Sequence, residues 1–444
     1  MLTTPQSIRT LQRKLYRKAK QEPAFRFYAL YDKVYRADNL NHAYRLVRAN
    51  KGGAGVDGVT VAAIESAEGQ TAFIAELQEA LKSKSYTPEP VRRVLIPKAD
   101  GSKRALGIPT IRDRVAQMAV KLVIEPIFEA DFCDCPYGYR PKKSAHDAVN
   151  DIAYALNCRY TEVIDADVTK YFGTIPHAKL LAVVAERIVD GAILHLLKMW
   201  LKAPVVGDSE DGMRRNIGGG KANTKGTPQG GVISPLLANL YLHLLDRLWE
   251  RRHLQKRFEA RLVRYADDIV VLCRKGTKTP LAEIQRVCDR LGLGLNEHKT
   301  RMVNAKQESF DFLGFEFRMR TSLRTGNLYP HVQPAKKSLK KIKAQITMLT
   351  NRRLTMLPLP VVLQRVNKAL MGWVGYFYYR NSSGSLEQLK RHAEQRVRIH
   401  LSRRYKLRGK WLGYIKFPNR LLYQRYGLYK VPTTAGWKRA HAVR

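Results

Sequence analysis

The stretch that decides the fold is Arg261-Leu262-Val263-Arg264-Tyr265-Ala266-Asp267-Asp268-Ile269-Val270-Val271-Leu272. Two apolar, β-prone runs flank a short turn, so the pattern predicts a β-hairpin. Asp267 and Asp268 stand side by side at its tip, where a stable hairpin more often has Asn-Gly or Asp-Gly. Two like charges about 4 Å apart repel by roughly 4 kcal/mol at an effective dielectric near 20. A bound Mg²⁺ ion removes that repulsion and keeps coordination positions for water and phosphate. The alternative is an ordinary surface turn, because Asp is common in turns.

The amino-acid composition limits the classes of protein to which this chain can belong. The 444 residues are enough for two to four domains, and 45% hydrophobic content excludes a disordered chain. The formal net charge of +41 predicts a polyanionic partner such as nucleic acid. A membrane partner is disfavoured because no apolar run approaches the 18 or so residues of a spanning helix. The five cysteines form no Cys-x-x-Cys pair, which indicates a reducing compartment and no zinc module. We therefore expect a cytoplasmic, nucleic-acid-binding protein.

The sequence pattern of the N-terminal part predicts basic helices followed by a β-hairpin. Residues 1–50 have the character of basic helices, and the glycines of residues 51–58 indicate a loop. A helix is expected from Thr71 to Ser83. Residues 91–98 and 103–109 form two strands around a turn. Asp113 is a candidate cap for the long helix that follows.

The remainder alternates strand, loop and helix before becoming strongly basic. We expect a strand over residues 162–168, a glycine-rich loop over 205–231, helices over 234–249 and 281–291, and one β segment over 310–317. After Pro334, an apolar stripe with lysines on the other faces predicts an amphipathic basic helix in a small bundle. Residues 381–444 hold 16 Lys or Arg against two Glu, a net charge of +14. This tail carries more than twice its uniform share of the charge.

Three features occur in a particular order. A strand presents Asp167, with Phe172 five residues later; a Pro-Gln-Gly-Gly loop opens a helix; and the Asp267-Asp268 hairpin follows. This order resembles the palm of reverse transcriptases. The wider match is to bacterial group II intron reverse transcriptase/maturases, and it covers nearly the whole chain. The stretches that carry it are Ile96-Pro97-Lys98, Arg104–Pro109, Asp113-Arg114, Tyr137–Pro141, Gly226–Asn239, Tyr265–Asp268, Phe312–Phe315 and Gly372–Phe377.

The resemblance implies an α+β right-hand polymerase, with fingers and palm, a helical thumb and a basic C-terminal maturase/RNA-binding region. We expect an N-terminal helical extension over residues 1–60, fingers and palm over 61–330, the start of the thumb over 331–380, and the maturase region over 381–444. The implied activity is RNA-dependent DNA polymerase, combined with binding of intron RNA to assist splicing and mobility. The implied partners are an RNA template, intron RNA, a DNA primer or target and dNTPs, in a bacterial cytoplasm near the nucleoid.

The chemistry of nucleotide addition needs two Mg²⁺ ions held by carboxylates. Asp167 and Asp267 are the expected ligands and Asp268 the third carboxylate. Asp165 is the rival of Asp167, because both lie on one strand face; the aromatic five residues on favours Asp167. The resemblance makes Phe172 the steric gate against a ribose 2′-hydroxyl, with a core phenylalanine as the alternative. It places four further residues at the incoming nucleotide: Lys98, Arg104, Gln229 and Lys299, the last as proton donor to pyrophosphate.

Two more groups of residues complete the expectation. Phe312, Leu313, Gly314 and Phe315 correspond to the primer grip, with a plain core strand as the alternative. The tail cations Arg403, Arg404, Lys410, Lys416 and Arg420 interleave with aromatics and are expected to bind RNA, although those aromatics could equally form a core.

One departure from the family pattern is Gly173, where an aspartate commonly stands. It leaves open whether the rate or the fidelity differs. The alternatives to an active polymerase are an RNA-binding splicing cofactor with an inactive palm and a related transcriptase recruited to defence or repair.

Overall fold

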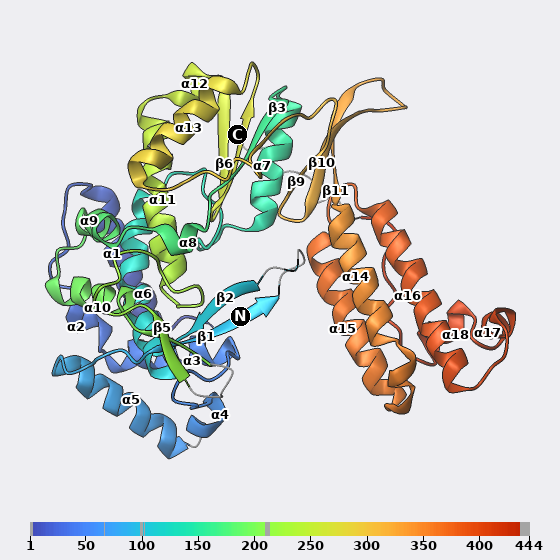
Figure 1. Cartoon of the computed structure of the whole chain (residues 1–444), viewed down its shortest axis with the longest axis horizontal. Helices are drawn as coiled ribbons and strands as arrows, with labels where there is room; N and C mark the ends of the chain where they lie inside the picture. Colours follow the sequence, from blue (N-terminus) through green and yellow to red (C-terminus); the bar gives the residue numbers. More distant parts are fainter. Residues whose placement is uncertain (1–2, 66, 98–100, 102, 209–213, 436–444) are drawn as a thin grey trace. The chain divides into compact units, whose positions relative to one another are not determined.

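The computed structural model describes residues 3–65, 67–97, 101, 103–208 and 214–435. The chain combines helices with three β-sheets (Figure 1). It divides into two compact units: Met1–Ser144, Asp165–Val271 and Thr277–Arg301 form the first, and Ala145–Ile164, Leu272–Gly276 and Met302–Arg444 form the second. In the part of the chain that the structure describes, no helix is long and apolar enough to cross a membrane.

The first unit opens with helices that pack around α6 (Ile111–Asp131). Helices α1 (Gln6–Gln21) and α3 (Ala37–Ala49) both contact it, as Figure 1 shows. The remaining helices before it are α2 (Tyr31–Val34), α4 (Val61–Ile64) and α5 (Ala67–Lys82). These elements confirm the predicted basic helices, but the cap of α6 differs from the prediction. Thr110 is the N-cap, and its hydroxyl accepts from the backbone N–H of Asp113 at 3.1 Å. Asp113 sits one turn inside, because Thr110 is the residue with extended backbone.

A four-stranded sheet, here named the hairpin sheet, follows in the order β2-β1-β4-β5. β1 (Val91–Pro97) and β2 (Lys103–Ile108) form the predicted antiparallel hairpin, with Ile96 opposite Arg104. The expectation of a continuous loop over residues 205–231 was wrong in part. β4 (Val205–Asp208) pairs in parallel with β1, and β5 (Arg214–Gly218) pairs with β4. The partner of β4 lies more than a hundred residues earlier, so local glycine content gave no sign of it.

The second sheet, named the aspartate sheet, has the order β6-β7-β3-β8. Its strands are β3 (Glu162–Asp167), β6 (Ala260–Tyr265), β7 (Asp268–Cys273) and β8 (Arg301–Asn304). The helices of the first unit that follow α6 are α8 (Tyr171–Thr174), α9 (His177–Ala185), α10 (Gly191–Leu201), α11 (Ser234–Arg251), α12 (Leu254–Arg257) and α13 (Lys278–Leu291). Ile269 to Cys273 are buried, as expected for a central strand that presents both faces to protein.

The second unit contains α7 (Ala145–Asn157), a three-stranded sheet and a helical bundle. The sheet order is β11-β10-β9, with β9 (Phe310–Phe312), β10 (Phe315–Thr321) and β11 (Leu328–Pro334). The expected single β segment over 310–317 is instead a hairpin, because Leu313 and Gly314 have positive φ angles of 50° and 81°. Two successive residues with positive φ form the kind of tight turn whose twist suits a hairpin.

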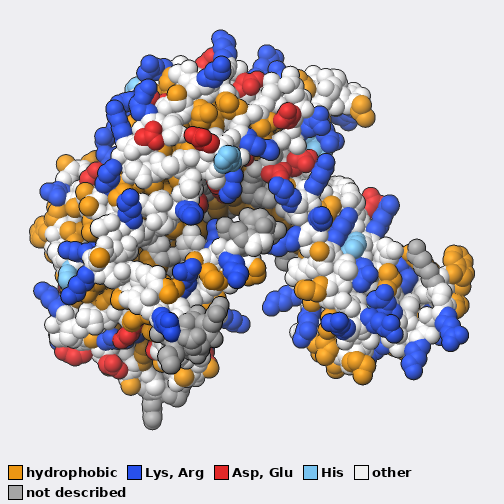
Figure 2. Space-filling model, in the orientation of Figure 1, with side chains coloured by type: hydrophobic (Ala, Val, Ile, Leu, Met, Phe, Trp, Pro, Cys, Tyr) orange, Lys and Arg blue, Asp and Glu red, His pale blue; other side chains and the backbone are white. Residues whose placement is uncertain are grey.

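The bundle confirms the amphipathic helix predicted after Pro334. Helix α14 (Lys336–Leu349) buries Ile342 and Ile346, and it packs against α15 (Leu359–Phe377) and α16 (Ser383–Arg404), as Figure 1 shows. The shorter η1 (Arg352–Met356), α17 (Lys410–Lys416) and α18 (Asn419–Gln424) complete it. Figure 2 shows Lys and Arg side chains across the face of this unit that is in view.

Candidate active site

The structure brings the three predicted carboxylates together on neighbouring strands. β7 lies between β6 and β3 in the aspartate sheet. Asp267 lies in the β6–β7 turn, Asp268 begins β7, and Asp167 ends β3. Ala266, just before them, has a left-handed φ of 57°, which reverses the chain tightly at this point. The turn therefore presents two adjacent carboxylates beside the end of the next strand.

The charges of these carboxylates act on one another. Burial and the charge on Asp167 raise the pKa of Asp267. The pKa of Asp268 rises to about 7, first because surrounding protein displaces water and then because Asp267, Asp165 and Asp167 are negative. The Asp268 side chain nevertheless keeps access to solvent, so a ligand can reach it. The site holds more negative charge than nearby Arg104 offsets, which favours a cation.

Asp165 and Asp167 share one half-buried face of β3, as their alternation predicts. Asp167 has two partners from one loop: its Oδ2 accepts from Asn296 Nδ2 at 3.3 Å and lies 3.4 Å from Lys299 Nζ. The charge on Asp165 contributes to the raised pKa of Asp268. Both carboxylates thus belong to the cluster, and Asp167 remains the proposed ligand.

The donor set suits Mg²⁺ bound together with substrate. Within the described residues, no group of three or more His, Cys, Asp or Glu side chains is arranged to hold a metal by itself. Magnesium usually takes one or two carboxylates and completes its shell with water and substrate phosphates. Among the described residues, a few carboxylates on neighbouring strands, without further protein ligands, fit that pattern better than a closed protein cage does.

Two of the predicted nucleotide-binding residues, Arg104 and Lys299, interact with the cluster, and Phe172 lies elsewhere in the same unit. Arg104 is exposed on β2, and its positive charge partly offsets the rise in the pKa values of Asp267 and Asp268. Phe172 lies half-buried on α8, its ring 5.7 Å from that of Tyr171. Lys299 is exposed beside Asp167. Lys98 lies outside the described residues.

A loop over residues 226–231 ties these elements together. The backbone N–H of Thr227 donates to the Phe172 carbonyl at 2.7 Å, and that of Gly107 on β2 donates to the Gln229 carbonyl at 2.6 Å. Gly230 has φ of 117°, and a Cβ there would lie 2.3 Å from the Gly107 oxygen. Only glycine permits this approach. The loop therefore sets the predicted gate, Gln229 and the strand of Arg104 relative to one another.

A buried network supports the aspartate turn, and sequence reasoning missed it. The guanidinium of Arg264 is fully buried; its Nε donates to Asp246 at 3.0 Å, and its Nη1 donates to Asn239 at 3.0 Å and to the Ala266 carbonyl at 2.9 Å. Asp246 holds the pKa of Arg264 above its ordinary value, and Arg264 lowers that of Asp246. The sequence signal for this network was the position of Arg264, a charged residue within the apolar run before the turn.

The segment Tyr137-Gly138-Tyr139 lies directly against the same turn. The Gly138 carbonyl accepts from Asn239 Nδ2 at 2.5 Å, and the Tyr137 N–H donates to the Arg264 carbonyl at 2.8 Å. A Cβ on Gly138 would lie 2.4 Å from the backbone nitrogen of Ala266. The rings of Tyr139 and Tyr265 lie 6.5 Å apart, and the charge on Asp267 helps to raise the pKa of Tyr139. Gly138 thus lets two backbones meet beneath the carboxylates.

The residues predicted as primer grip form the β9–β10 turn of the second unit. Phe312 and Phe315 are buried, which agrees with their alternative as core residues. The Leu313 carbonyl accepts from the Tyr376 hydroxyl at 2.9 Å, and the Gly314 carbonyl accepts from the Ala335 N–H at 2.8 Å. The turn is therefore fixed to α14 and α15 from within its own unit.

Comparison with known families identifies the family of the region that contains the aspartate sheet. Residues 96–317, half of the 444-residue chain, match the family described as reverse transcriptase (RNA-dependent DNA polymerase). The chain belongs to the reverse transcriptase family. Residues 339–414 match the maturase-specific domain of group II introns. The polymerase and maturase resemblance in the sequence is thereby confirmed.

Curated relatives of this reverse transcriptase support the family assignment. Protein YkfC of Escherichia coli is 34% identical over 348 residues, covering 69% of this chain and 87% of YkfC. The group II intron-encoded protein LtrA of Lactococcus lactis is 30% identical over 361 residues, covering 67% of this chain and 57% of LtrA. An uncharacterized 91 kDa protein in the cob intron of Schizosaccharomyces pombe is 28% identical over 382 residues, covering 70% of this chain and 46% of that protein. The chain thus spans about half the length of the two intron-encoded relatives.

Some of the predicted RNA-binding residues in the tail of this reverse transcriptase are exposed, and one is engaged in hydrogen bonds within the protein. Arg403, Lys416 and Arg420 are exposed, whereas Arg404 Nη1 donates to the carbonyls of Thr355 and Leu357 at 3.0 and 2.6 Å. The side chain of Lys410 lies outside the described part. The aromatics divide in the same way: Trp411 and Tyr414 are exposed, and Tyr423, Tyr426 and Tyr429 pack against the bundle core.

Proposed function

We propose that this chain copies RNA into DNA at the aspartate sheet, with Asp167, Asp267 and Asp268 binding two Mg²⁺ ions. One observation carries the proposal: Asp167 at the end of β3 lies on the strand next to Asp267 and Asp268, whose pKa values are raised by burial and by neighbouring negative charge, near exposed Arg104. Such a cluster favours cations and, through them, a triphosphate. When bound, the ions activate the primer 3′-hydroxyl and stabilise the leaving pyrophosphate.

The side chains around the cluster have distinct roles towards a dNTP. Arg104 offers a planar fork to the triphosphate, and Lys98 adds a point charge. Gln229 contacts the nucleotide from the glycine-bounded loop. Phe172 blocks a ribose 2′-hydroxyl, and the Thr227 N–H that binds its carbonyl fixes its place.

In the transfer itself, the primer 3′-oxygen bonds to the α-phosphorus as the bond to pyrophosphate breaks. Lys299 supplies a proton to that pyrophosphate. Its 3.4 Å ion pair with Asp167 holds the ammonium group at the site before substrate binds.

The second unit serves the nucleic acid in this proposal. The turn from Phe312 to Phe315 acts as the primer grip, and the helices after residue 331 act as the thumb. Exposed Arg403, Lys416 and Arg420 bind intron RNA with Trp411 and Tyr414, because cations hold phosphates while exposed rings stack on unpaired bases. We assign fingers and palm to residues 61–330, the N-terminal extension to residues 1–60 and the maturase region to residues 381–444. The site of action is the bacterial nucleoid, where intron RNA and target DNA meet.

Primer extension on an RNA template, with Mg²⁺ and dNTPs, tests the polymerase. Wild type should extend the primer, and Asp267→Asn should not. Asp289→Asn is the matched control, since that carboxylate is exposed on α13. Equal background product from wild type and Asp267→Asn would end the polymerase proposal.

The same variant tests whether splicing and synthesis separate. Asp267→Asn should still bind and help to splice the cognate intron RNA, because the tail makes those contacts. Loss of RNA binding together with loss of extension would place both roles at the aspartate sheet and reject the assignment to the tail.

A further inference from the structure

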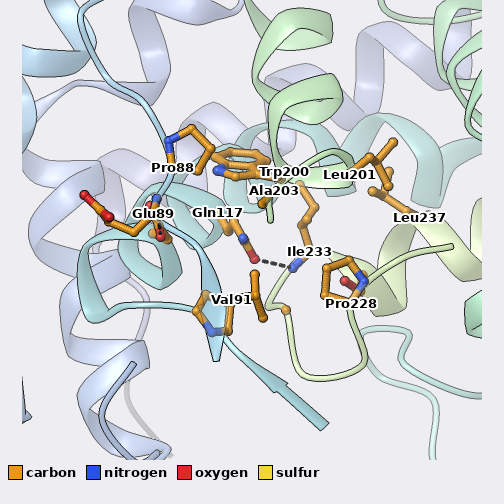
Figure 3. Close-up of a pocket in the computed structure, with 14 residues that line it drawn as sticks. Pro88, Glu89, Val91, Gln117, Trp200, Leu201, Ala203, Pro228, Ile233 and Leu237 are labelled. Carbon is orange, nitrogen blue, oxygen red and sulfur yellow. Dashed lines mark hydrogen bonds between the residues drawn. The ribbon is translucent and has the colours of Figure 1, made fainter. Parts of the chain in front are cut away.

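Gln117 is a neutral polar residue buried on α6. Only 5% of the residue is exposed. Its Oε1 accepts from the backbone N–H of Val232 at 2.8 Å and from that of Ile233 at 3.5 Å, and Figure 3 shows the side chain aimed at Ile233. These two groups end the loop that carries Gln229. Gln117 thus binds the loop from a different element.

Gln117 Oε1 is a side-chain acceptor for backbone N–H groups at the start of α11, which has no capping side chain of its own. Ile233 is the N-cap of α11, and no side chain of the helix itself caps it. The N–H groups at a helix start have no partners within the helix, so a buried start needs an acceptor from elsewhere. Gln117 fills that role at the point where the loop becomes helix.

The opposite part of the loop is tied to the predicted nucleotide site. Thr227 binds the Phe172 carbonyl, and Gln229 binds Gly107 of β2. A displacement at Val232 is three residues from Gln229 and five from Thr227. The loop is short and bonded along its length, so a shift at one end moves the other.

We infer that Gln117 is a positioning residue for nucleotide selection, which rests on the proposed polymerase function. By holding Val232 and Ile233, it sets where Gln229 and the Phe172 gate meet the incoming dNTP. Gln117 itself does not touch substrate.

The surroundings of Gln117 explain why the acceptor is an amide. Asp113 lies one helical turn earlier, is buried, and has a pKa raised by that burial. A cavity of about 10 Å³ lies between these residues, Trp200 and Pro228, so the packing is nearly complete (Figure 3). A methionine fits the same volume but offers no comparable acceptor, and a glutamate keeps the acceptor oxygen in either protonation state.

The test compares Gln117→Met and Gln117→Glu in steady-state primer extension, measured with dNTPs and with rNTPs. Gln117→Met should raise the KM for dNTP on the order of tenfold, because two buried N–H groups lose their acceptor and the loop shifts. It should also lower the preference for dNTP over rNTP. Gln117→Glu should keep both values near those of wild type. The control is Gln78→Met, which removes an amide that donates to the Tyr35 carbonyl instead.

The outcomes separate the inference from the proposed function. A wild-type protein without extension activity refutes the polymerase itself. An active wild type with unchanged KM and unchanged sugar preference in Gln117→Met overturns the inference, as does an equal defect in Gln117→Glu. Should Gln117→Met be unfolded at the assay temperature, Gly231→Ala replaces it. Its Cβ would lie 3.3 Å from Gln117 Oε1 and 2.7 Å from Ser234 Oγ. The same rise in KM is expected there, and its absence would overturn the inference.

Discussion

Replacing Gly138 by alanine is the sharpest perturbation of the aspartate turn that leaves every carboxylate in place. The added Cβ would lie 2.4 Å from the backbone nitrogen of Ala266 and 3.1 Å from the carbonyl carbon of Tyr265. Ordinary van der Waals contact begins near 3.4 Å. The two backbones must therefore separate by about 1 Å, because neither atom belongs to a flexible side chain.

The displaced turn carries Asp267 and Asp268, so the loss should appear in catalysis. A misplacement of about 1 Å costs on the order of 100-fold in rate, which corresponds to roughly 2.7 kcal/mol in activation free energy. The assay is primer extension at increasing Mg²⁺ concentration. We expect Gly138→Ala to lower the maximal rate by about that factor, and to need more Mg²⁺ for half of it.

The control for this variant is Gly191→Ala at the start of α10, where a Cβ meets nothing within 4 Å. That protein should extend primers at the wild-type rate and unfold at the same or a slightly higher temperature. A Gly138→Ala protein with wild-type rate and wild-type Mg²⁺ dependence would refute the idea that close backbone packing sets the carboxylates.

The carboxylate cluster, the Arg264 network and the predicted gate can each be perturbed separately. The pKa of Asp268 in the folded protein, about 7, lies above its ordinary 3.8, so without metal its contribution to stability declines as pH rises through this interval. Mg²⁺ should therefore raise the melting temperature more at about pH 8 than at about pH 6, and an equal shift at both pH values, or the same pH dependence in Asp268→Asn, would contradict this. Arg264→Met should lose about 3–5 kcal/mol of unfolding free energy in urea titrations, since buried Asp246 loses its partner; the double variant Arg264→Met/Asp246→Leu should recover part of it, and a loss under about 1 kcal/mol in the single variant would count against the network. Phe172→Ala should increase ribonucleotide incorporation in extension assays, whereas an unchanged preference for dNTPs rejects the gate.

Local sequence was enough where the signal was local. Period-two alternation placed Asp165 and Asp167 on one strand face, and the paired aspartates between two β-prone runs marked the turn. The apolar stripe after Pro334 gave α14, because a helix must bury one face. The order of three such signals along the chain was enough to indicate the family.

Pairing between segments that are distant in the sequence leaves no such local signal. β4 forms only beside β1, and its glycine-rich neighbourhood gives no local preference for a strand. Gln117 and Arg264 resembled ordinary helix and strand residues, since their roles depend on backbone groups more than a hundred residues away or on a buried carboxylate from another element.

The sequence by itself determined which residues carry charge and which segments are helix or strand, because side-chain chemistry and periodicity are properties of the chain. Only the tertiary structure decided which carboxylates share one electrostatic environment, which glycines permit two backbones to meet, and which buried polar groups hold the loop. Those properties depend on distances of a few ångströms between residues far apart in sequence, and packing of the whole unit sets those distances.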